Sequence, residues 1–150
     1  MKSLTHYIQE KLVIKKNKYK YFPQTKEELK EIIKKRIKEE GNEADLNDID
    51  VSNITDMSYL FSKNDNFNGD ISAWNVSNVT DMSYMFSNCE LFNQDISNWN
   101  VSNVTNMSYM FNGCKSFNEN ISKWDVSNVK NMDGIFYSCQ IEEKYKPKFK

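Results

Sequence analysis

The sequence predicts an α/β repeat solenoid whose coils each carry one short strand and one short helix, behind a helical cap at the amino terminus. Three observations lead to this prediction: a 25-residue repeat, a change of apolar spacing inside each repeat, and an amphipathic segment ahead of the first repeat. The chain has 150 residues, which suits one domain. We therefore expect a basic capping region at residues 1–44, the solenoid at 45–140 and a basic tail at 141–150.

The repeat is visible when the chain is aligned at steps of 25 residues. Four segments then coincide, VSNITDMSYLF, VSNVTDMSYMF, VSNVTNMSYMF and VSNVKNMDGIF, which begin at Val51, Val76, Val101 and Val126. The same step relates Trp74, Trp99 and Trp124, and also Phe67, Phe92 and Phe117. Before the first full unit, Leu46 and Ile49 occupy the columns of Ile71 and Trp74, so the array begins with a partial coil.

The apolar spacing inside one repeat indicates the local structure. Trp74 and Val76 alternate with polar neighbours, as a short strand requires. Apolar residues then recur at steps of three and four, which predicts one or two helical turns with a buried face, at Val79, Met82, Met85, Phe86 and Cys89. Because one such coil cannot bury its apolar face alone, the coils must stack and pair their strands.

The amino-terminal region predicts two helices. Thr25 and Glu28 form a capping box, an apolar stripe follows, and Gly41 ends the segment, so a helix is expected from Lys26 to Glu40. Upstream, an apolar stripe fits a helix from Ser3 to about Leu12 followed by extended chain. A hairpin of KLVIKK with YKYF is the competing interpretation, because the two overlap at residues 11–14.

At the other end the repeat pattern stops after Cys139. The tail EEKYKPKFK either folds over the last coil through Tyr145 and Phe149 or remains free, and the sequence supports both alternatives equally.

The unit DIS-x-W-N-VSN-VT-x-M-SYMF-x-x-C-x-x-FN resembles the leucine-rich repeats of BspA-like bacterial surface proteins, including the related repeat proteins of mycoplasmas. The resemblance covers about two thirds of the chain. It implies a leucine-rich-repeat-like solenoid of right-handed coils, used for adhesion or protein recognition. Versions that stand alone without an export signal resemble proteins carried by bacteria and their phages, for which the resemblance implies no fixed activity.

Charge is distributed unevenly along the chain. Residues 1–44 hold 12 basic and 7 acidic residues, whereas residues 45–140 hold 4 basic and 12 acidic ones. An acidic body repels phosphate, which disfavours direct binding of nucleic acid. His6 is the single histidine, and no glycine-rich phosphate loop or serine elbow is present. The sequence therefore predicts neither an enzyme nor a cofactor.

Two sets of residues have a structural and a chemical interpretation. Cys89, Cys114 and Cys139 share one column and could form a disulfide or hold a metal, but ligands two to four residues apart are missing. Buried free thiols are the favoured interpretation, and no metal site is predicted. The three tryptophans could form a carbohydrate platform, yet their place in the strand pattern favours the core.

Two exposed surfaces are candidates for binding a partner. Tyr59, Tyr84 and Tyr109 fall off the buried stripe and should form an exposed aromatic row, which is typical of recognition surfaces. Shielding of the methionine core is an equally good explanation of these tyrosines. A polar sheet face is expected at the positions that alternate with the core, namely Asp48, Asp50, Asn75, Asn98, Asn100, Lys123 and Asp125.

These observations favour a non-enzymatic module that binds a protein partner of unknown identity. No apolar run reaches the roughly 20 residues of a membrane span, and MKSLTHYIQEKLVIKK lacks the apolar core of a signal peptide, so a cytoplasmic location is predicted. One alternative is a phage or mobile-element inhibitor of a host defence nuclease, acting in the host cytoplasm, whose acidic body would occupy a basic channel. A further alternative is a surface adhesin exported by a non-standard route. The oligomeric state and the face that binds remain open.

Overall fold

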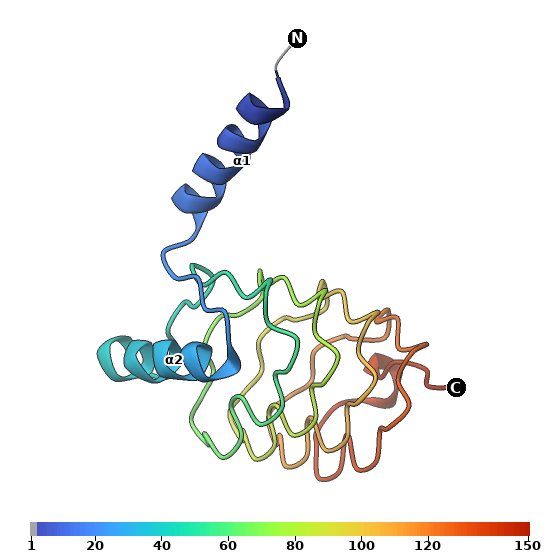
Figure 1. The fold of residues 1–150 in the computed structure, drawn as a ribbon. Helices are drawn as coiled ribbons and strands as arrows, with labels where there is room; N and C mark the ends of the chain where they lie inside the picture. Colours follow the sequence, from blue (N-terminus) through green and yellow to red (C-terminus); the bar gives the residue numbers. More distant parts are fainter. Residues whose placement is uncertain (1–2) are drawn as a thin grey trace.

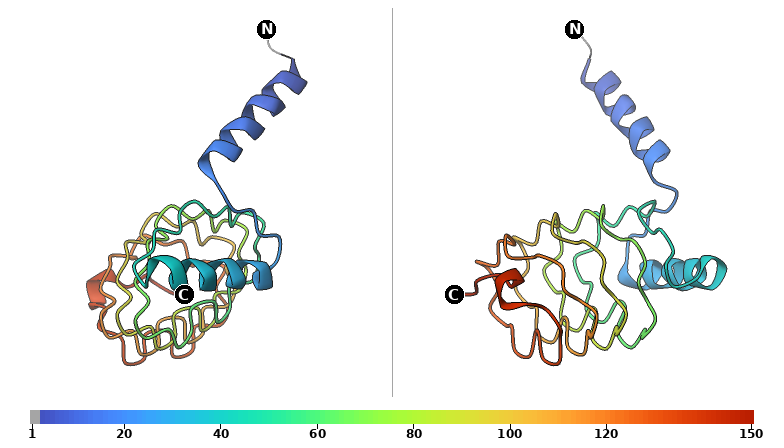
Figure 2. Two further views of the ribbon diagram at one scale, coloured as in Figure 1. Left: turned by 90° about the vertical axis from the view of Figure 1, so that its left-hand side faces the viewer. Right: turned by 180° about the vertical axis from the view of Figure 1, so that it is seen from behind.

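The computed structural model describes residues 3–150 and contains two α-helices and one short 3-10 helix in that range. These are α1 (Leu4–Lys18), α2 (Lys26–Glu40) and η1 (Glu143–Tyr145). Between α2 and η1 the chain winds through a series of loops that lie side by side, with α2 across one end and the carboxyl terminus at the other (Figure 1). A view along the series shows the loops superimposed on one another (Figure 2).

The predicted α/β solenoid, with a strand and a helix in each coil, is wrong. Residues 45–140 are mostly coil and turn, and within residues 3–150 no extended strand occurs. Isolated parallel bridges are the β-type pairing that connects successive repeats, for example between Asp56 and Asp81 and between Asp81 and Asn106. Each repeat is therefore a loop of tight turns.

Asx turns explain why neither strand nor helix forms. In such a turn the side-chain oxygen of Asp or Asn accepts the backbone N–H two residues on, which competes with regular structure. One repeat contains three of them, in which Asp70 accepts from Ser72 at 3.0 Å, Asn75 from Ser77 at 3.1 Å and Asp81 from Ser83 at 2.8 Å. The backbone therefore turns at each of these Asx residues.

The three-residue apolar spacing that suggested a helix comes from these turns. The N–H of Met85 donates to the carbonyl of Met82, and that of Cys89 to the carbonyl of Phe86, which are the bonds of successive β-turns. Tyr84, the third residue of the first of these turns, has a φ of 57°, a left-handed conformation that ends any α-helix. Turns with buried residues three apart thus imitate a helical period.

Successive repeats are joined through four segments, residues 56–63, 81–88, 106–113 and 131–138, which we call the tyrosine segments. Every second N–H of one segment donates to a carbonyl of the next at 2.7–3.0 Å. At the first junction these bonds run from Met57 to Asp81, Tyr59 to Ser83, Phe61 to Met85 and Lys63 to Ser87. The donors thus belong to the earlier segment and the acceptors to the later one, so the ladder has a direction.

Stacked aromatic columns fill the core. Phe61, Phe86, Phe111 and Phe136 stack at centroid distances of 5.6–5.8 Å. The predicted core position of Trp74, Trp99 and Trp124 is confirmed, since each is at most 5% exposed. Each indole N–H also donates to a buried carbonyl of the preceding repeat at 2.9–3.1 Å. The tryptophans therefore join repeats by both packing and hydrogen bonding.

Helix α2 has the bounds that the sequence predicts. The Thr25 hydroxyl accepts the N–H of Glu28 at 3.2 Å, and the Glu28 carboxylate accepts the N–H of Gln24 at 2.7 Å, so the capping box closes one residue earlier than its usual form. Leu29 and Ile33 are buried in the core that the repeats share. The helix thus covers the end of the series where the repeats begin (Figure 1).

Helix α1 is longer than expected, and both the extended chain after Leu12 and the KLVIKK hairpin are wrong. The Ser3 hydroxyl caps its first turn, and the helix continues through residues 11–18. It projects away from the repeats in every view (Figures 1 and 2), and none of its described side chains is buried. Within residues 3–150, no helix combines the length and apolarity that crossing a membrane requires.

The tail folds over the last repeat, which selects one of the two alternatives left open by the sequence. The carbonyl of Tyr145 accepts the N–H of Ile121 at 3.0 Å. Tyr145 and Phe149 are partly buried against the core, and Ile141 belongs to it.

Candidate binding surface

The three tyrosines of the predicted row lie one above another as a stacked column. The rings of Tyr59 and Tyr84 are 4.6 Å apart with an interplanar angle of 4°, and those of Tyr84 and Tyr109 are 5.0 Å apart at 14°. Tyr59 is 51% exposed, whereas Tyr84 and Tyr109 are half-buried. We call these three residues the tyrosine column. The methionines beside them in sequence lie in the core, so the rings form its outer layer.

The backbone of the tyrosine column has an unusual conformation. Tyr59, Tyr84 and Tyr109 have φ of 60°, 57° and 54°, in the left-handed region that costs a non-glycine residue roughly 1–2 kcal/mol. Asn and Gly fit this conformation with less strain. Strained backbone of this kind is concentrated at functional sites in proteins. The strain therefore marks the column as a candidate site beyond its role in packing.

The tyrosine column is closed at one end and open at the other. In the fourth repeat the same position is Gly134, where an added Cβ would lie 2.4 Å from Cε1 of Tyr109. Tyr109 therefore packs on the glycine backbone and has no free face there. Tyr59, in the first repeat, has Tyr84 on one side and no ring on the other within the described residues.

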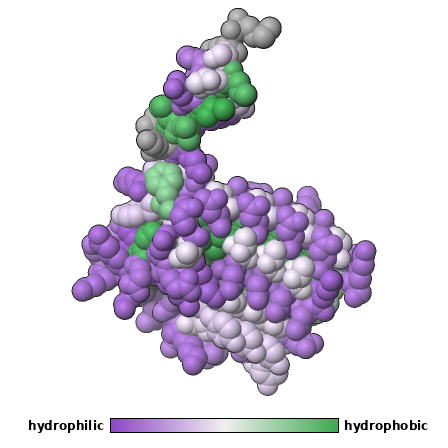
Figure 3. Space-filling view, viewed as in Figure 1, coloured by the Kyte–Doolittle hydropathy of each residue, from purple (hydrophilic) through white to green (hydrophobic). Residues whose placement is uncertain are grey.

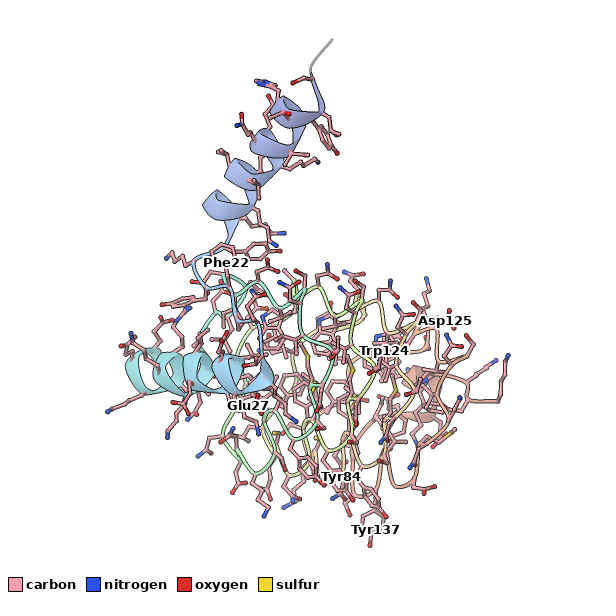
Figure 4. The ribbon with its side chains drawn as sticks, viewed as in Figure 1. Phe22, Glu27, Tyr84, Trp124, Asp125 and Tyr137 are labelled. Atoms are coloured by element: carbon pink, nitrogen blue, oxygen red, sulfur yellow. The ribbon has the colours of Figure 1, made fainter. Side chains whose placement is uncertain are left out.

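A fourth exposed tyrosine lies on this side of the molecule, and the sequence analysis did not predict it. Tyr137 is 70% exposed and comes three residues after Gly134, outside the tyrosine column. Tyr84 and Tyr137 both lie along the lower edge of the molecule in Figure 4, and the same edge is a pale patch on a mostly polar surface in Figure 3. Tyr84 and Tyr137 thus lie on the same side of the molecule, away from Asp125 (Figure 4).

The predicted polar face contains a shallow depression of about 590 Å³, although it is not a sheet. Asn75, Asn98 and Asn100 line it together with Asp95. Asn75 and Asn100 each hold an Asx turn through a serine hydroxyl at 2.6–2.7 Å, and Asp125 holds the equivalent turn in the last repeat. The side-chain oxygens of Asn75, Asn100 and Asp125 thus already accept hydrogen bonds within their own turns.

Asp48 and Asp50 do not line this depression, because both are paired with the amino-terminal region. Asp48 accepts from Nη1 of Arg36 at 2.6 Å, and Asp50 from Nζ of Lys15 at 2.6 Å. Burial would raise the pKa of Asp50, but the hydrogen bonds from Lys15 and Ser52 outweigh it and hold this pKa below its usual range. Both carboxylates therefore fasten the helices to the first repeat.

Lys123 is exposed and does not line the depression either. The predicted polar face is thus divided: three asparagines line the depression, two aspartates form ion pairs, and Lys123 and Asp125 lie beyond it.

The cysteine column consists of free thiols, as the sequence favours. Cys89 and Cys114 are buried, and their Sγ atoms donate to carbonyl oxygens of Phe61 and Phe86 at 2.9 and 3.0 Å. Burial raises the pKa of the Cys89 thiol to about 12 and raises that of Cys114 further. Within residues 3–150, no cluster of three or more His, Cys, Asp or Glu side chains is arranged to hold a metal ion.

A family model matches most of the chain. The family is described as "Mycoplasma protein of unknown function, DUF285", and the match covers residues 27–148. The chain belongs to the DUF285 family. The match begins in α2 and extends to the tail, so this helix is part of the DUF285 region. No curated protein and no solved structure is significantly similar to the chain.

Two lysines of α2 lie beside the tyrosine column of this DUF285 protein, and the sequence analysis did not predict them either. Lys30 and Lys34 lie one turn apart and face the first repeat across a hollow that Tyr59 also lines. The spacing of four residues on a helix could have indicated a shared face. What no sequence pattern predicted is that this face would lie beside the open end of the tyrosine column.

Proposed function

We propose that this protein is a non-enzymatic binding module that holds a protein partner through the tyrosine column. The observation that carries the proposal is the column itself: three stacked, partly exposed tyrosines that retain a strained backbone. Tyrosine combines a large apolar ring with a polar tip and few rotatable bonds, which is why it is enriched at protein interfaces.

Packing alone explains the column less well. The rings lie outside a core already filled by the phenylalanine and methionine columns. If these positions served only to continue the turns, glycine would do so without backbone strain, as Gly134 does in the fourth repeat. Selection for an exposed aromatic surface accounts for the difference.

Site-specific photocrosslinking in the cell that makes the protein tests this proposal. A benzophenone side chain is placed at Tyr84 in one variant and at Lys123, on the polar face, in a matched variant. We expect a crosslink of discrete mass to one protein from the Tyr84 position and none from Lys123. A crosslink from Lys123 alone would place the binding site on the polar face, and no discrete crosslink from either position would contradict the proposal.

A further inference from the structure

The hollow between α2 and the first repeat is the second candidate site on this molecule. Its volume is about 400 Å³, within the range of about 300–1,000 Å³ that is typical of ligand sites. Helix α2 contributes Lys30, Ile33 and Lys34, and the first repeat contributes Tyr59, Leu60 and Ser62. We call this space the α2 hollow.

The first tyrosine segment has carbonyl groups whose usual donors are absent. In later segments, the carbonyls of Asp81, Ser83, Met85 and Ser87 each accept an N–H from the preceding repeat. The equivalent carbonyls in the first segment belong to Asp56, Ser58, Leu60 and Ser62. No repeat precedes them, because α2 occupies that end (Figure 1).

Lys26 donates hydrogen bonds at the beginning of this row of carbonyls. Its ammonium group donates to the Ser58 carbonyl at 3.4 Å and to the Asp56 carboxylate at 3.0 Å. The carbonyls of Leu60 and Ser62 have no donor among residues 3–150. These two residues line the α2 hollow, so both backbone acceptors belong to residues of its wall.

Three further features of the hollow point to one kind of occupant. The open end of the tyrosine column is there, because Tyr59 lines the hollow and lacks a second ring. Lys30 and Lys34 are exposed and form no ion pair with another described residue, which favours an acidic occupant. Ile33 and Leu60 are buried and form an apolar floor.

We propose that the α2 hollow binds an extended acidic segment of a partner protein, which continues the ladder of repeats by one step. Its backbone N–H groups donate to the carbonyls of Leu60 and Ser62, its aromatic side chain stacks on Tyr59, and its carboxylates pair with Lys30 and Lys34. This inference rests on the proposed function and names the chemistry of the segment that is recognised. The mode is the addition of an extended segment to an open row of backbone hydrogen-bonding groups.

A nucleotide, the other planar and anionic class of ligand, fits less well. Its phosphates are acceptors and cannot pair with the carbonyls of Leu60 and Ser62, which need donors. A peptide backbone supplies N–H donors at the spacing of two residues that separates these carbonyls.

Binding of a synthetic peptide by the full chain tests the inference. The probe is EETDMSYLFSK, which copies residues 55–63, the segment that donates to the second repeat in the protein itself, and adds two glutamates. In NMR spectra of the ¹⁵N-labelled chain, we expect saturable shifts at residues 60–64 and 30–34 and none in the fourth repeat. Absence of saturable shifts at peptide concentrations up to about 1 mM would overturn the inference.

Matched variants test two of the three interactions, the charge pairing and the ring stacking. Lys30→Glu with Lys34→Glu should weaken binding by about tenfold or more, whereas Lys130→Glu with Lys148→Glu, the same charge change far from the hollow, should leave it unchanged. Tyr59→Asn keeps a residue that tolerates positive φ but removes the ring, and should also weaken binding. Equal effects of both lysine pairs would contradict a specific site.

One change to the probe and one competing ligand decide the mode of binding. A peptide N-methylated at its Phe and Lys amides, the counterparts of Phe61 and Lys63, cannot donate to Leu60 or Ser62, so it should bind about tenfold more weakly. If it binds equally well, backbone pairing is wrong. If ADP displaces the peptide and produces the same shifts more strongly, the hollow is a nucleotide site and the inference is overturned.

The result also separates this inference from the proposed function. A crosslink from Tyr84 without peptide binding would leave the binding module in place and overturn the α2 hollow as its site. Peptide binding without any crosslink from Tyr84 would support the hollow and contradict a contact of the partner with the middle of the tyrosine column.

Discussion

The third and fourth repeats place similar residues in two different environments. Val104, Met107 and Phe111 are fully buried, whereas the equivalent Val129, Met132 and Phe136 are partly exposed. The two segments, VSNVTNMSYMF and VSNVKNMDGIF, have apolar residues in the same columns. The difference therefore comes from neighbours: the third repeat has a repeat on both sides, whereas the fourth has a repeat on one side and only the short tail on the other.

The two ends of the series are also covered to different extents, by α2 at the first repeat and by the tail at the fourth. Helix α2 buries Leu29 and Ile33 against the first repeat and brings a row of lysines with it. At the other end the tail contributes η1 and partly buried aromatic residues, and the last tyrosine segment keeps unpaired N–H groups at Met132, Gly134 and Phe136 within the described chain. Stability should therefore be greatest in the middle repeats and lowest in the fourth.

The largest effect on stability is expected from replacing a phenylalanine of one column, first in a repeat with neighbours on both sides and then in the fourth repeat. Phe86→Ala removes a fully buried ring stacked between Phe61 and Phe111 and should lower the free energy of unfolding by about 3–5 kcal/mol. Phe136→Ala removes a ring with one stacking neighbour in the column and should cost about 1–2 kcal/mol. Urea denaturation of both variants measures the difference, and equal losses would show that position along the series does not matter.

Reactivity of the cysteine column gives a second test. Burial raises the pKa of all three thiols, but Cys139 of the fourth repeat is half-buried, whereas Cys89 and Cys114 are completely buried. Iodoacetamide at pH 8 should therefore alkylate Cys139 at least about tenfold faster than the other two in the native protein. Peptide mass spectrometry after timed quenching measures the rates. Equal rates in the native state, with faster reaction in urea as the control, would contradict the comparison.

Sequence periodicity predicted which positions align from repeat to repeat and which lie in the core, but the strand and helix that it predicted within each repeat are wrong. The 25-residue step established which residues stack, and Trp74, Trp99 and Trp124 are buried as expected. Turns with apolar residues three apart and a short amphipathic helix share one spacing, so the period could not distinguish them. The signal that could have done so is Asp or Asn two residues before Ser, two or three times in each repeat, as at Asp70, Asn75 and Asp81.

The candidate site was predictable to the extent that it lies within the repeats. The tyrosine column followed from the 25-residue step, because residues in one column must stack. The partners of Asp48 and Asp50, and the place of Lys30 and Lys34, depend on how the amino-terminal helices lie against the first repeat. That contact occurs once in the molecule, so no repetition in the sequence reveals it.

The Asx turns allow a test of whether side-chain hydrogen bonds hold the loops. Asn100→Ala removes the acceptor for the N–H and hydroxyl of Ser102, at 3.1 and 2.7 Å, and should cost about 1 kcal/mol. Asn100→Asp retains the acceptor, as Asp125 does in the next repeat, and should be nearly neutral. Thermal unfolding of the pair measures the difference. Equal melting temperatures would show that packing alone fixes the turn.

The smallest expected effect concerns acid stability, which should differ between repeats with Asp and with Asn in the same turn. Hydrogen bonds from the Ser72 and Ser97 hydroxyls lower the pKa of Asp70 and Asp95, whereas Asn120 forms the equivalent turn without a charge. Because these pKa values are lower in the folded than in the unfolded chain, their contribution to stability is present above the unfolded pKa and is lost as the pH falls through the folded one.

The double variant Asp70→Asn with Asp95→Asn should therefore be slightly less stable than the native chain at pH 7, and this gap should close at pH 3. Charge-assisted hydrogen bonds are stronger than neutral ones, which gives the sign at pH 7. Urea midpoints at both pH values measure the gap, with Asp65→Asn as the control, since Asp65 forms no Asx turn within residues 3–150. If the gap were independent of pH, the serine hydroxyls would not stabilise the carboxylates, and the turns would be held equally by Asp and Asn.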